Sequence, residues 1–186
     1  LAELPLHPRF SQMLVKAGAT AAPLAALLSD RDILISREAD LTPALQALSN
    51  NGPNHQIRDP EALKRIKIEA KRLLKFIPKN SFLIKHSPAQ CLALAYPERV
   101  AQRRPGIQPH YIMANGKGVV LANDDGLANA PFLVISELGN SNHSSGPDPK
   151  IRRALSISSD EIREIFGSQI KWLETCRWSK RARKVL

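Results

Sequence analysis

The spacing of apolar residues changes part-way along this chain, and that change constrains the fold more than any other feature. Up to about residue 103, apolar side chains recur at three- and four-residue steps, which is the period of amphipathic helices. From His110 onward they occur in short runs rich in β-forming residues, separated by turn sequences. We therefore expect an α+β fold, in which an N-terminal helical bundle leads into a small OB-like β-barrel with an inserted helix.

The first half of the chain carries start signals for several short helices. Thr20, Thr42 and Asp59 are each positioned to cap a helix with a side-chain oxygen. Proline follows Thr42 and Asp59 directly, at the first helical position, where it is tolerated. The helices are expected over residues 9–17, 21–28, 43–48, 60–76 and 90–103, the last of them bent or interrupted at Pro97.

The second half carries strand and turn signals. Asn115-Gly116 predicts a hairpin with a type I′ turn, because both central residues of that turn need positive φ. Ser158 or Ser159 is expected to cap a helix over residues 160–166 that ends at Gly167. The strands are expected over residues 110–114, 119–122, 132–138 and 151–157, with two more over 170–177 and 181–186.

The chain is strongly basic. Lys and Arg number 27 against 17 Asp and Glu, which gives a formal net charge of +10 and a pI near 10.0. Such a field favours polyanions such as phosphate backbones, although charge alone does not separate RNA, DNA and anionic lipid. Aromatic residues are only 5% of the chain, and no run approaches the roughly 18 apolar residues of a membrane span. We therefore expect a soluble protein with no membrane partner and no leader peptide.

The motifs of common active sites are missing from the sequence. It has no GxxxxGK[ST] phosphate loop, no HExxH and no GxSxG, and its five histidines lack metal-ligand or triad spacing. Cys91 and Cys176 stand far apart and are expected to be buried free thiols in a reducing cytoplasm. Asp124, Asp125 and Glu137 could converge as a carboxylate site, but their turn context favours structural roles. No catalytic residue, metal or cofactor is therefore expected in this segment.

Two basic patterns have both a functional and a structural interpretation. Lys64, Lys67, Lys71 and Lys75 fall at three- and four-residue steps, opposite the apolar stripe of the expected helix over 60–76. They form either a solvated face or a rail that contacts phosphates. A second basic run is either a truncated strand or a tail that attracts RNA, and it consists of Arg177, Lys180, Arg181, Arg183 and Lys184.

Two stretches resemble a known family. Residues 2–9 (AELPLHPR), followed by Met13-Leu14, resemble the segment of DEAH-type helicases where a winged-helix domain passes into a helical ratchet domain. Residues 92–104 (LALAYPERVAQRR) are similar to the signature that opens the terminal region of the HrpB group of bacterial DEAH-type RNA helicases. Residues 27–34, 111–118 and 132–138 are also similar to that group.

The resemblance implies a larger parent protein, a nucleotide-binding hydrolase. In that family, two RecA-like motor domains bind ATP and Mg, and couple hydrolysis to movement along RNA. The ratchet and OB-like domains cover one face of the RNA channel. It implies a ratchet-like domain over residues 1–78, whose first residues are the tail of a winged-helix domain, and an OB-like domain over 79–186, truncated at its C-terminus. The expected partners are single-stranded RNA and the RecA-like and winged-helix domains of the same polypeptide, in the cytoplasm.

The candidate RNA-binding residues combine cations with one aromatic ring. Trp172 and Trp178 are expected to be structural or to face the missing domains, and Tyr96 to lie in the core. Tyr111 is the candidate for base stacking, although a strand aromatic more often belongs to a core. The candidate cations are Lys64, Lys67 and Lys71 on the helical rail, Arg99, Arg103 and Arg104 in the family signature, and Lys117 at the hairpin tip. The alternatives are a free-standing OB-type single-stranded nucleic-acid-binding protein and an unrecognised enzyme.

Overall fold

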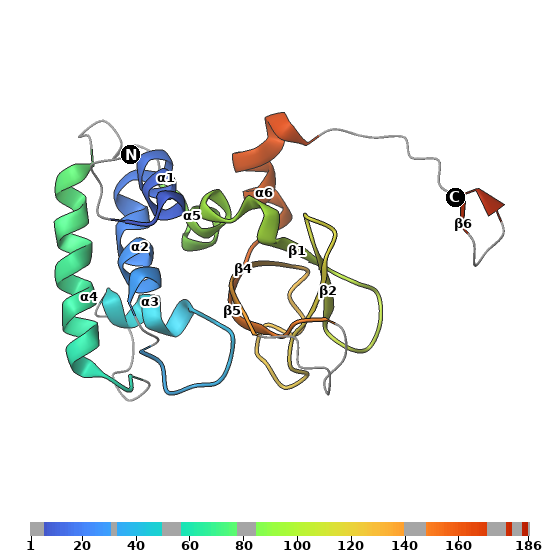
Figure 1. The fold of residues 1–186 in the computed structure, drawn as a ribbon, viewed down its shortest axis with the longest axis horizontal. Helices are drawn as coiled ribbons and strands as arrows, with labels where there is room; N and C mark the ends of the chain where they lie inside the picture. The colour runs from blue at the N-terminus through green and yellow to red at the C-terminus, as the bar shows by residue number, and fades with distance from the viewer. Residues whose placement is uncertain are drawn as a thin grey trace.

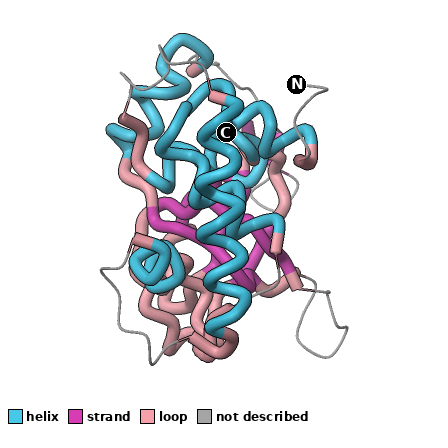
Figure 2. The backbone as a smooth tube through the Cα atoms, turned by 90° about the vertical axis from the view of Figure 1, so that its left-hand side faces the viewer, coloured by secondary structure: helices cyan, strands magenta, loops and turns pink. Residues whose placement is uncertain are grey.

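Helices gather at one end of the molecule and a curled sheet at the other (Figure 1). The computed structural model describes residues 6–30, 33–49, 57–77, 85–139, 148–170, 178–179 and 184–185. Figure 2 views the molecule from the side of α4, where helices lie in front of the strands. The expected α+β class is confirmed.

Most helices begin and end near the residues that the sequence predicts. The α-helices are α1 (Pro8–Ala17), α2 (Ala22–Ser29), α3 (Thr42–Leu48), α4 (Pro60–Leu73), α5 (Pro88–Ala95) and α6 (Ser159–Phe166). Short 3-10 turns extend or join them: η1 (Gly18–Ala21), η3 (Leu74–Phe76), η5 (Pro97–Arg99) and η6 (Gly167–Gln169).

Side-chain caps fix the starts of α4 and α6 as predicted. Asp59 accepts a hydrogen bond from the backbone N–H of Ala62 at 2.9 Å. Ser158 and Glu161 form a reciprocal capping box at the start of α6. Each cap satisfies N–H groups that have no partner within the helix, which stabilises the first turn.

The predictions that Thr20 and Thr42 cap helices are wrong. The Thr20 hydroxyl donates to the carbonyl of Ala17 at 2.9 Å, so it closes the preceding turn and does not cap α2. Before α3, Asp40 accepts hydrogen bonds from both the backbone N–H and the hydroxyl of Thr42, at 2.8 and 2.7 Å. The carboxylate therefore organises this turn, and Thr42 itself begins the helix.

The sheet has five antiparallel strands in the order β3-β2-β1-β4-β5. The strands are β1 (Val100–Arg103), β2 (His110–Met113), β3 (Gly118–Val120), β4 (Phe132–Leu138) and β5 (Ile151–Ser156). A parallel bridge between Val120 and Lys150 joins the end of β3 to the residue before β5, so the sheet curls back on itself. This curled half-barrel is consistent with an OB-like fold.

The central strand β1 lies where a helix was expected. Pro97 ends the helical pattern, and residues 100–103 pair with β2 on one side and β4 on the other. Ala101 is buried while Gln102 is exposed, which is the two-residue alternation of a strand. A strand of four residues is too short to produce a clear alternation in the sequence.

The helix predicted over residues 160–166 is confirmed as α6, which follows β5, but the predicted turn type needs correction. Residues 121–131 between β3 and β4 form successive turns. The hairpin β2–β3 is confirmed, but its loop has three residues, because Met113 N–H pairs with the carbonyl of Lys117 at 3.0 Å. The N–H of Gly116 donates to the carbonyl of Met113 and closes a turn. Gly116 itself has a φ of 83°, and a residue of positive φ after a turn is typical of three-residue hairpin loops.

The end of the chain contains a separate two-stranded sheet. It pairs β6 (Trp178–Ser179) with β7 (Lys184–Val185). The second strand lies inside the predicted range 181–186, and the first begins just after the predicted range 170–177. Residues 171–177, and with them Trp172 and Cys176, lie outside the described residues.

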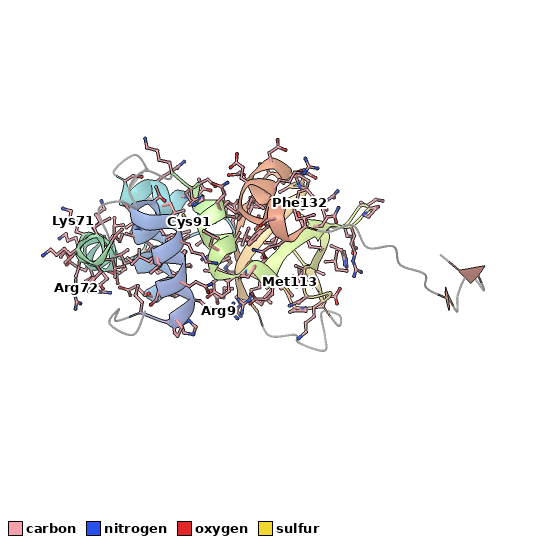
Figure 3. The ribbon with its side chains drawn as sticks, turned by 90° about the horizontal axis from the view of Figure 1, so that it is seen from above. Arg9, Lys71, Arg72, Cys91, Met113 and Phe132 are labelled. Atoms are coloured by element: carbon pink, nitrogen blue, oxygen red, sulfur yellow. The ribbon has the colours of Figure 1, made fainter. Side chains whose placement is uncertain are left out.

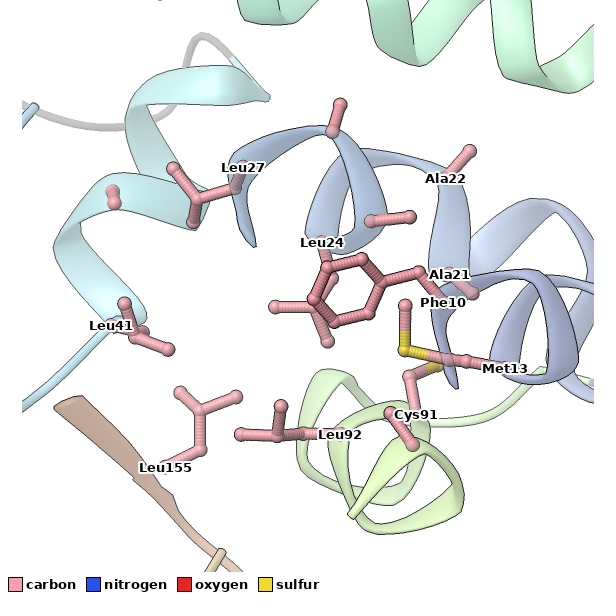
Figure 4. Packing of buried hydrophobic residues seen from close by; sticks show 14 of the residues in the cluster. Phe10, Met13, Ala21, Ala22, Leu24, Leu27, Leu41, Cys91, Leu92 and Leu155 are labelled. Carbon is pink, nitrogen blue, oxygen red and sulfur yellow. The ribbon is translucent and has the colours of Figure 1, made fainter. Parts of the chain in front are cut away.

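The helical core extends to one face of the sheet. Phe10 and Met13 of α1 and Leu24 of α2 share a buried cluster with Leu92 of α5 and Leu155 of β5. In Figure 4, Leu92 lies between the helices and Leu155. Because α5 contacts α1 on one side and the strands β4 and β5 on the other, it joins the two halves of the molecule.

A segment from the helical half also pairs with the sheet. Ala154 of β5 donates its N–H to the carbonyl of Ala39 at 2.8 Å and accepts from the N–H of Leu41 at 3.1 Å. The buried carboxylate of Asp125 accepts from the N–H of Ala39 at 2.7 Å and from the N–H of Leu127 at 2.9 Å. Residues 39–41 thereby extend the sheet beyond β5.

Replacing Asp125 by Ala should destabilise the protein, because two buried N–H groups would lose their acceptor. We expect the free energy of unfolding to fall by about 2–4 kcal/mol. Urea unfolding of Asp125→Ala measures this loss. The neighbouring Asp124 is exposed, so Asp124→Ala is the matched control. Equal stability of the two variants would contradict a structural role for the Asp125 carboxylate.

Candidate nucleic-acid interface

The helix α4 presents a basic face to solvent. It buries Ala62, Leu63, Ile66 and Leu73 against the other helices. The lysines predicted as a rail lie on its remaining surface, where Lys64 and Lys71 are exposed and Lys67 is half-buried. Figures 1 and 3 place α4 at the edge of the molecule farthest from the sheet, with Lys71 labelled on its outer side.

Neighbouring carboxylates neutralise part of this face. Lys64 pairs with Glu61 at 2.8 Å, and the hydrogen bond and charge of Glu61 raise the pKa of Lys64 above its ordinary value. Lys71 has no ion pair within the described part of the chain. Lys71 therefore presents an exposed charge that is available to a phosphate.

Exposed apolar side chains accompany the lysines. Ile68 is 67% exposed on α4, and Phe76 is 47% exposed on η3 at its end. An exposed ring beside cations can stack on a nucleic-acid base. Sequence reasoning did not single out Phe76, because it continues the three- and four-residue pattern of the apolar stripe.

The arginines of the family signature have structural partners. The Arg99 guanidinium lies over the Tyr96 ring at 4.6 Å and donates to the carbonyl of Ser136 at 2.7 Å. Arg103 donates to the carbonyl of Ala128 at 3.0 Å. These contacts attach β1 to its surroundings, and contact of either arginine with RNA stays a prediction.

The two stretches that carry the family resemblance meet in space. Arg9, from the first stretch, forms an ion pair with Glu98 of the second at 2.6 Å. Arg9 also donates to the carbonyl of Ala95 at 3.2 Å and lies 5.1 Å from the centre of the Tyr96 ring. The shared motif therefore fixes α1 against the junction between α5 and β1, which is an architectural role.

Arg104 and Lys117 lie at two exposed turns of the sheet. Arg104 follows β1, and Lys117 lies between the hairpin loop and β3. Both are exposed cations on the half-barrel, so both remain candidates for RNA contact.

Tyr111 is the one candidate residue whose predicted role in base stacking the structure contradicts. Its side chain is 0% exposed, and its hydroxyl, with one proton to donate, lies 3.0 to 3.3 Å from the carbonyl oxygens of Leu127, Ala128 and Ala130. Burial raises the pKa of Tyr111. A ring enclosed in the half-barrel cannot stack on a base, so the prediction of stacking was wrong and the alternative of a core residue is confirmed.

Within the described ranges, the geometry offers no cluster of metal ligands. No group of three or more His, Cys, Asp or Glu side chains there could hold a metal ion. Cys91 is buried, as predicted, and burial raises the pKa of its thiol to about 11, so it stays protonated at neutral pH. None of the described helices is both long enough and apolar enough to cross a membrane.

Comparison with known proteins relates the chain to one bacterial RNA helicase. No family model matches the sequence. The chain is 31% identical over 183 residues to the ATP-dependent RNA helicase HrpB of Escherichia coli K12, which covers 96% of this chain and 20% of that protein. The chain is homologous to a segment of HrpB.

Two solved structures of HrpB support the same relationship. The crystal structure of the E. coli DExH-box NTPase HrpB matches 97% of this chain and 21% of its own, with a TM-score of 0.66 and 26% identity. The crystal structure of the E. coli DEAH/RHA helicase HrpB has a TM-score of 0.61 and 23% identity over the same shares. The HrpB-like segment thus spans about a fifth of the length of its relatives, and the predicted resemblance to a C-terminal part of these helicases is confirmed.

Several cations of the HrpB-like segment escaped sequence reasoning. Arg37, Arg58, Lys150 and Arg152 come from three stretches of the chain and line one cleft. They share no periodicity with one another, and only the pairing of distant segments brings them together. The predicted division at residues 78 and 79, and the predicted winged-helix tail over the first residues, stay predictions.

Tyr111→Phe should lower the free energy of unfolding of the HrpB-like segment by about 1–2 kcal/mol, because three buried carbonyls would share the loss of one donor. Thermal or urea unfolding measures the change. Tyr96→Phe is the matched control, since the Tyr96 hydroxyl has no hydrogen-bond partner among the described residues. If both variants unfold alike, the Tyr111 hydroxyl does not hold the 127–130 turns.

Proposed function

We propose that this chain is an RNA-binding accessory region of an ATP-dependent RNA helicase of the HrpB type. The observation that carries the proposal is the match to E. coli HrpB along 96% of the chain. The net charge of +10 supports it, because a basic surface attracts the phosphate backbone of a nucleic acid. An RNA helicase of this kind would act in the cytoplasm.

In this proposal the chain grips single-stranded RNA while other domains supply the energy. RecA-like domains of the same polypeptide would bind ATP and Mg and change conformation as they hydrolyse the nucleotide. The chain's own sequence has no phosphate-binding loop. In this proposal its contribution is to hold RNA between the steps of the motor. Its helical half would correspond to the ratchet domain of the family.

The surface for this grip consists of exposed cations with few aromatic rings. The lysine face of α4 would contact phosphates, with Phe76 available to stack on a base at its end. Arg104 and Lys117 would extend the contact over the half-barrel. Contacts of this kind recognise the backbone and not the sequence of the RNA.

A free-standing single-stranded nucleic-acid-binding protein is the second candidate, because the curled five-stranded sheet is consistent with an OB-like fold. The two candidates differ in the affinity of the chain alone. A region that completes a channel should bind single-stranded RNA weakly, with a shallow dependence on salt. A free-standing binder should bind tightly, with a steep dependence.

The triple substitution of Lys64, Lys67 and Lys71 by Glu should lower the affinity for single-stranded RNA, because it replaces attraction to phosphates by repulsion. We expect at least about a tenfold rise in the dissociation constant at low salt, measured by fluorescence anisotropy.

Its control is the triple substitution of Lys16, Lys85 and Arg163 by Glu. These residues are exposed on α1, before α5 and on α6, and Arg163 pairs with Asp160 much as Lys64 pairs with Glu61. The control changes the net charge equally. If both variants bind RNA as tightly as the unaltered chain, or are weakened to the same extent, the lysines of α4 do not form the RNA contact.

A further inference from the structure

A basic cleft lies where the helical half meets the edge of the sheet. It has a volume of about 530 Å³. The side chains that give it charge are Arg37, Arg58, Lys150, Arg152, Arg153 and Glu137. Five of these six are cations, so the cleft carries a strong local excess of positive charge.

Backbone pairing between distant segments builds this cleft. Leu34 forms an antiparallel bridge with Ile57, and the N–H of Arg58 donates to the carbonyl of Ile33 at 2.8 Å. These bonds hold Arg58 beside the segment that contains Arg37. In Figure 1, the loop before α3 curves from the helices toward β5, where the third part of the cleft lies.

Arg153 of β5 fixes the wall of the cleft that the sheet forms. It is only 9% exposed, and its guanidinium donates to the carbonyls of Ser36 and Glu38. Arg153 therefore attaches the loop to β5 and sets the distance between the two walls. The neighbouring Lys150 and Arg152 are exposed on the strand side of the same cleft.

The cations of the cleft lack enough acidic partners. Glu137 is the one carboxylate in its lining and lies 4.0 Å from Arg152. Arg37, Arg58 and Lys150 have no ion pair among the residues that the structure describes. Cations gathered in a concave site with protein walls repel one another, and their field attracts an anion into the site.

We infer that this cleft binds the phosphodiester backbone of single-stranded RNA. The inference rests on the proposed function, which supplies RNA as the polyanion, and it names the site of contact. Arginine suits this role because its planar fork can donate two hydrogen bonds to one phosphate. The lining comes from loop segments of the helical half, with Arg37 and Arg58, and from the sheet, with Arg152, so RNA bound there contacts both halves.

One wall of the cleft also lies at the start of α4. Arg58 directly precedes Asp59, the N-cap of α4, so it lies at the start of the helix that carries Lys64 and Lys71. A strand of RNA that leaves the cleft at Arg58 meets the first turns of α4. The cleft and the lysine face thus form one candidate path for the backbone.

The test uses the full chain and a fluorescein-labelled oligouridylate of about 12 nucleotides, a length in the range that OB-type sites bind. In the variant, Arg37, Arg58 and Lys150 are all replaced by Ala, and Arg153 is kept because it holds the loop. We expect at least about a tenfold weaker affinity at low salt, and a log–log salt slope that is lower by about 2.

The control replaces Lys16, Lys85 and Arg163 by Ala, which removes the same charge from exposed positions elsewhere. The single exposed substitution Lys150→Glu serves as a second variant and should weaken binding severalfold. If the cleft variants bind like the unaltered chain, or no more weakly than the control, the cleft is not the site and the proposed function stands. If the unaltered chain fails to bind the RNA even at low salt, both the cleft and the proposed function are overturned.

Discussion

The buried guanidinium of Arg153 holds the two halves of this molecule together. It lies in the middle of β5 and donates to carbonyls of the 36–38 segment, which leads into α3. A charged donor bonded to carbonyls in a buried position is costly to break, because both partners would be left without hydrogen bonds. With that segment fixed, residues 39–41 can pair with β5 and place Ala39 against the Asp125 carboxylate. The pairing of residues 39–41 at the sheet edge and the shape of the cleft depend on this contact.

The family signature supports the same junction through a second set of contacts. The ion pair of Arg9 with Glu98 and the stacking of Arg9 and Arg99 on Tyr96 join α1 to the start of β1. Between these polar contacts, Leu92 of α5 carries the helical core to the sheet. The residues most typical of the family therefore stabilise the arrangement, and the exposed cations around them remain free to contact RNA.

Local signals predicted much of the fold, and long-range pairing decided the rest. The Asp59 cap, the hairpin at Asn115-Gly116 and the strand β4 depend on neighbours in the sequence, and all three were predicted. The strand β1 was not, because four residues after Pro97 show too little alternation, and its character comes from the two strands beside it. Tyr111 could be read as a stacking ring or as core, and only the turns that enclose it settle the choice. The cleft was beyond prediction, because its cations meet only when distant segments pair.

The central claim of this account is that RNA follows the basic path formed by the cleft and the lysine face of α4. Ultraviolet crosslinking of the full chain to 4-thiouridine-labelled single-stranded RNA, with the crosslinked peptides identified by mass spectrometry, tests it most directly. The account predicts crosslinks in peptides that contain Arg37, Arg58 or Lys150 and in peptides from α4. Crosslinks confined to other surfaces, such as the exposed residues of α1 and α6 around Lys16 and Arg163, would contradict it.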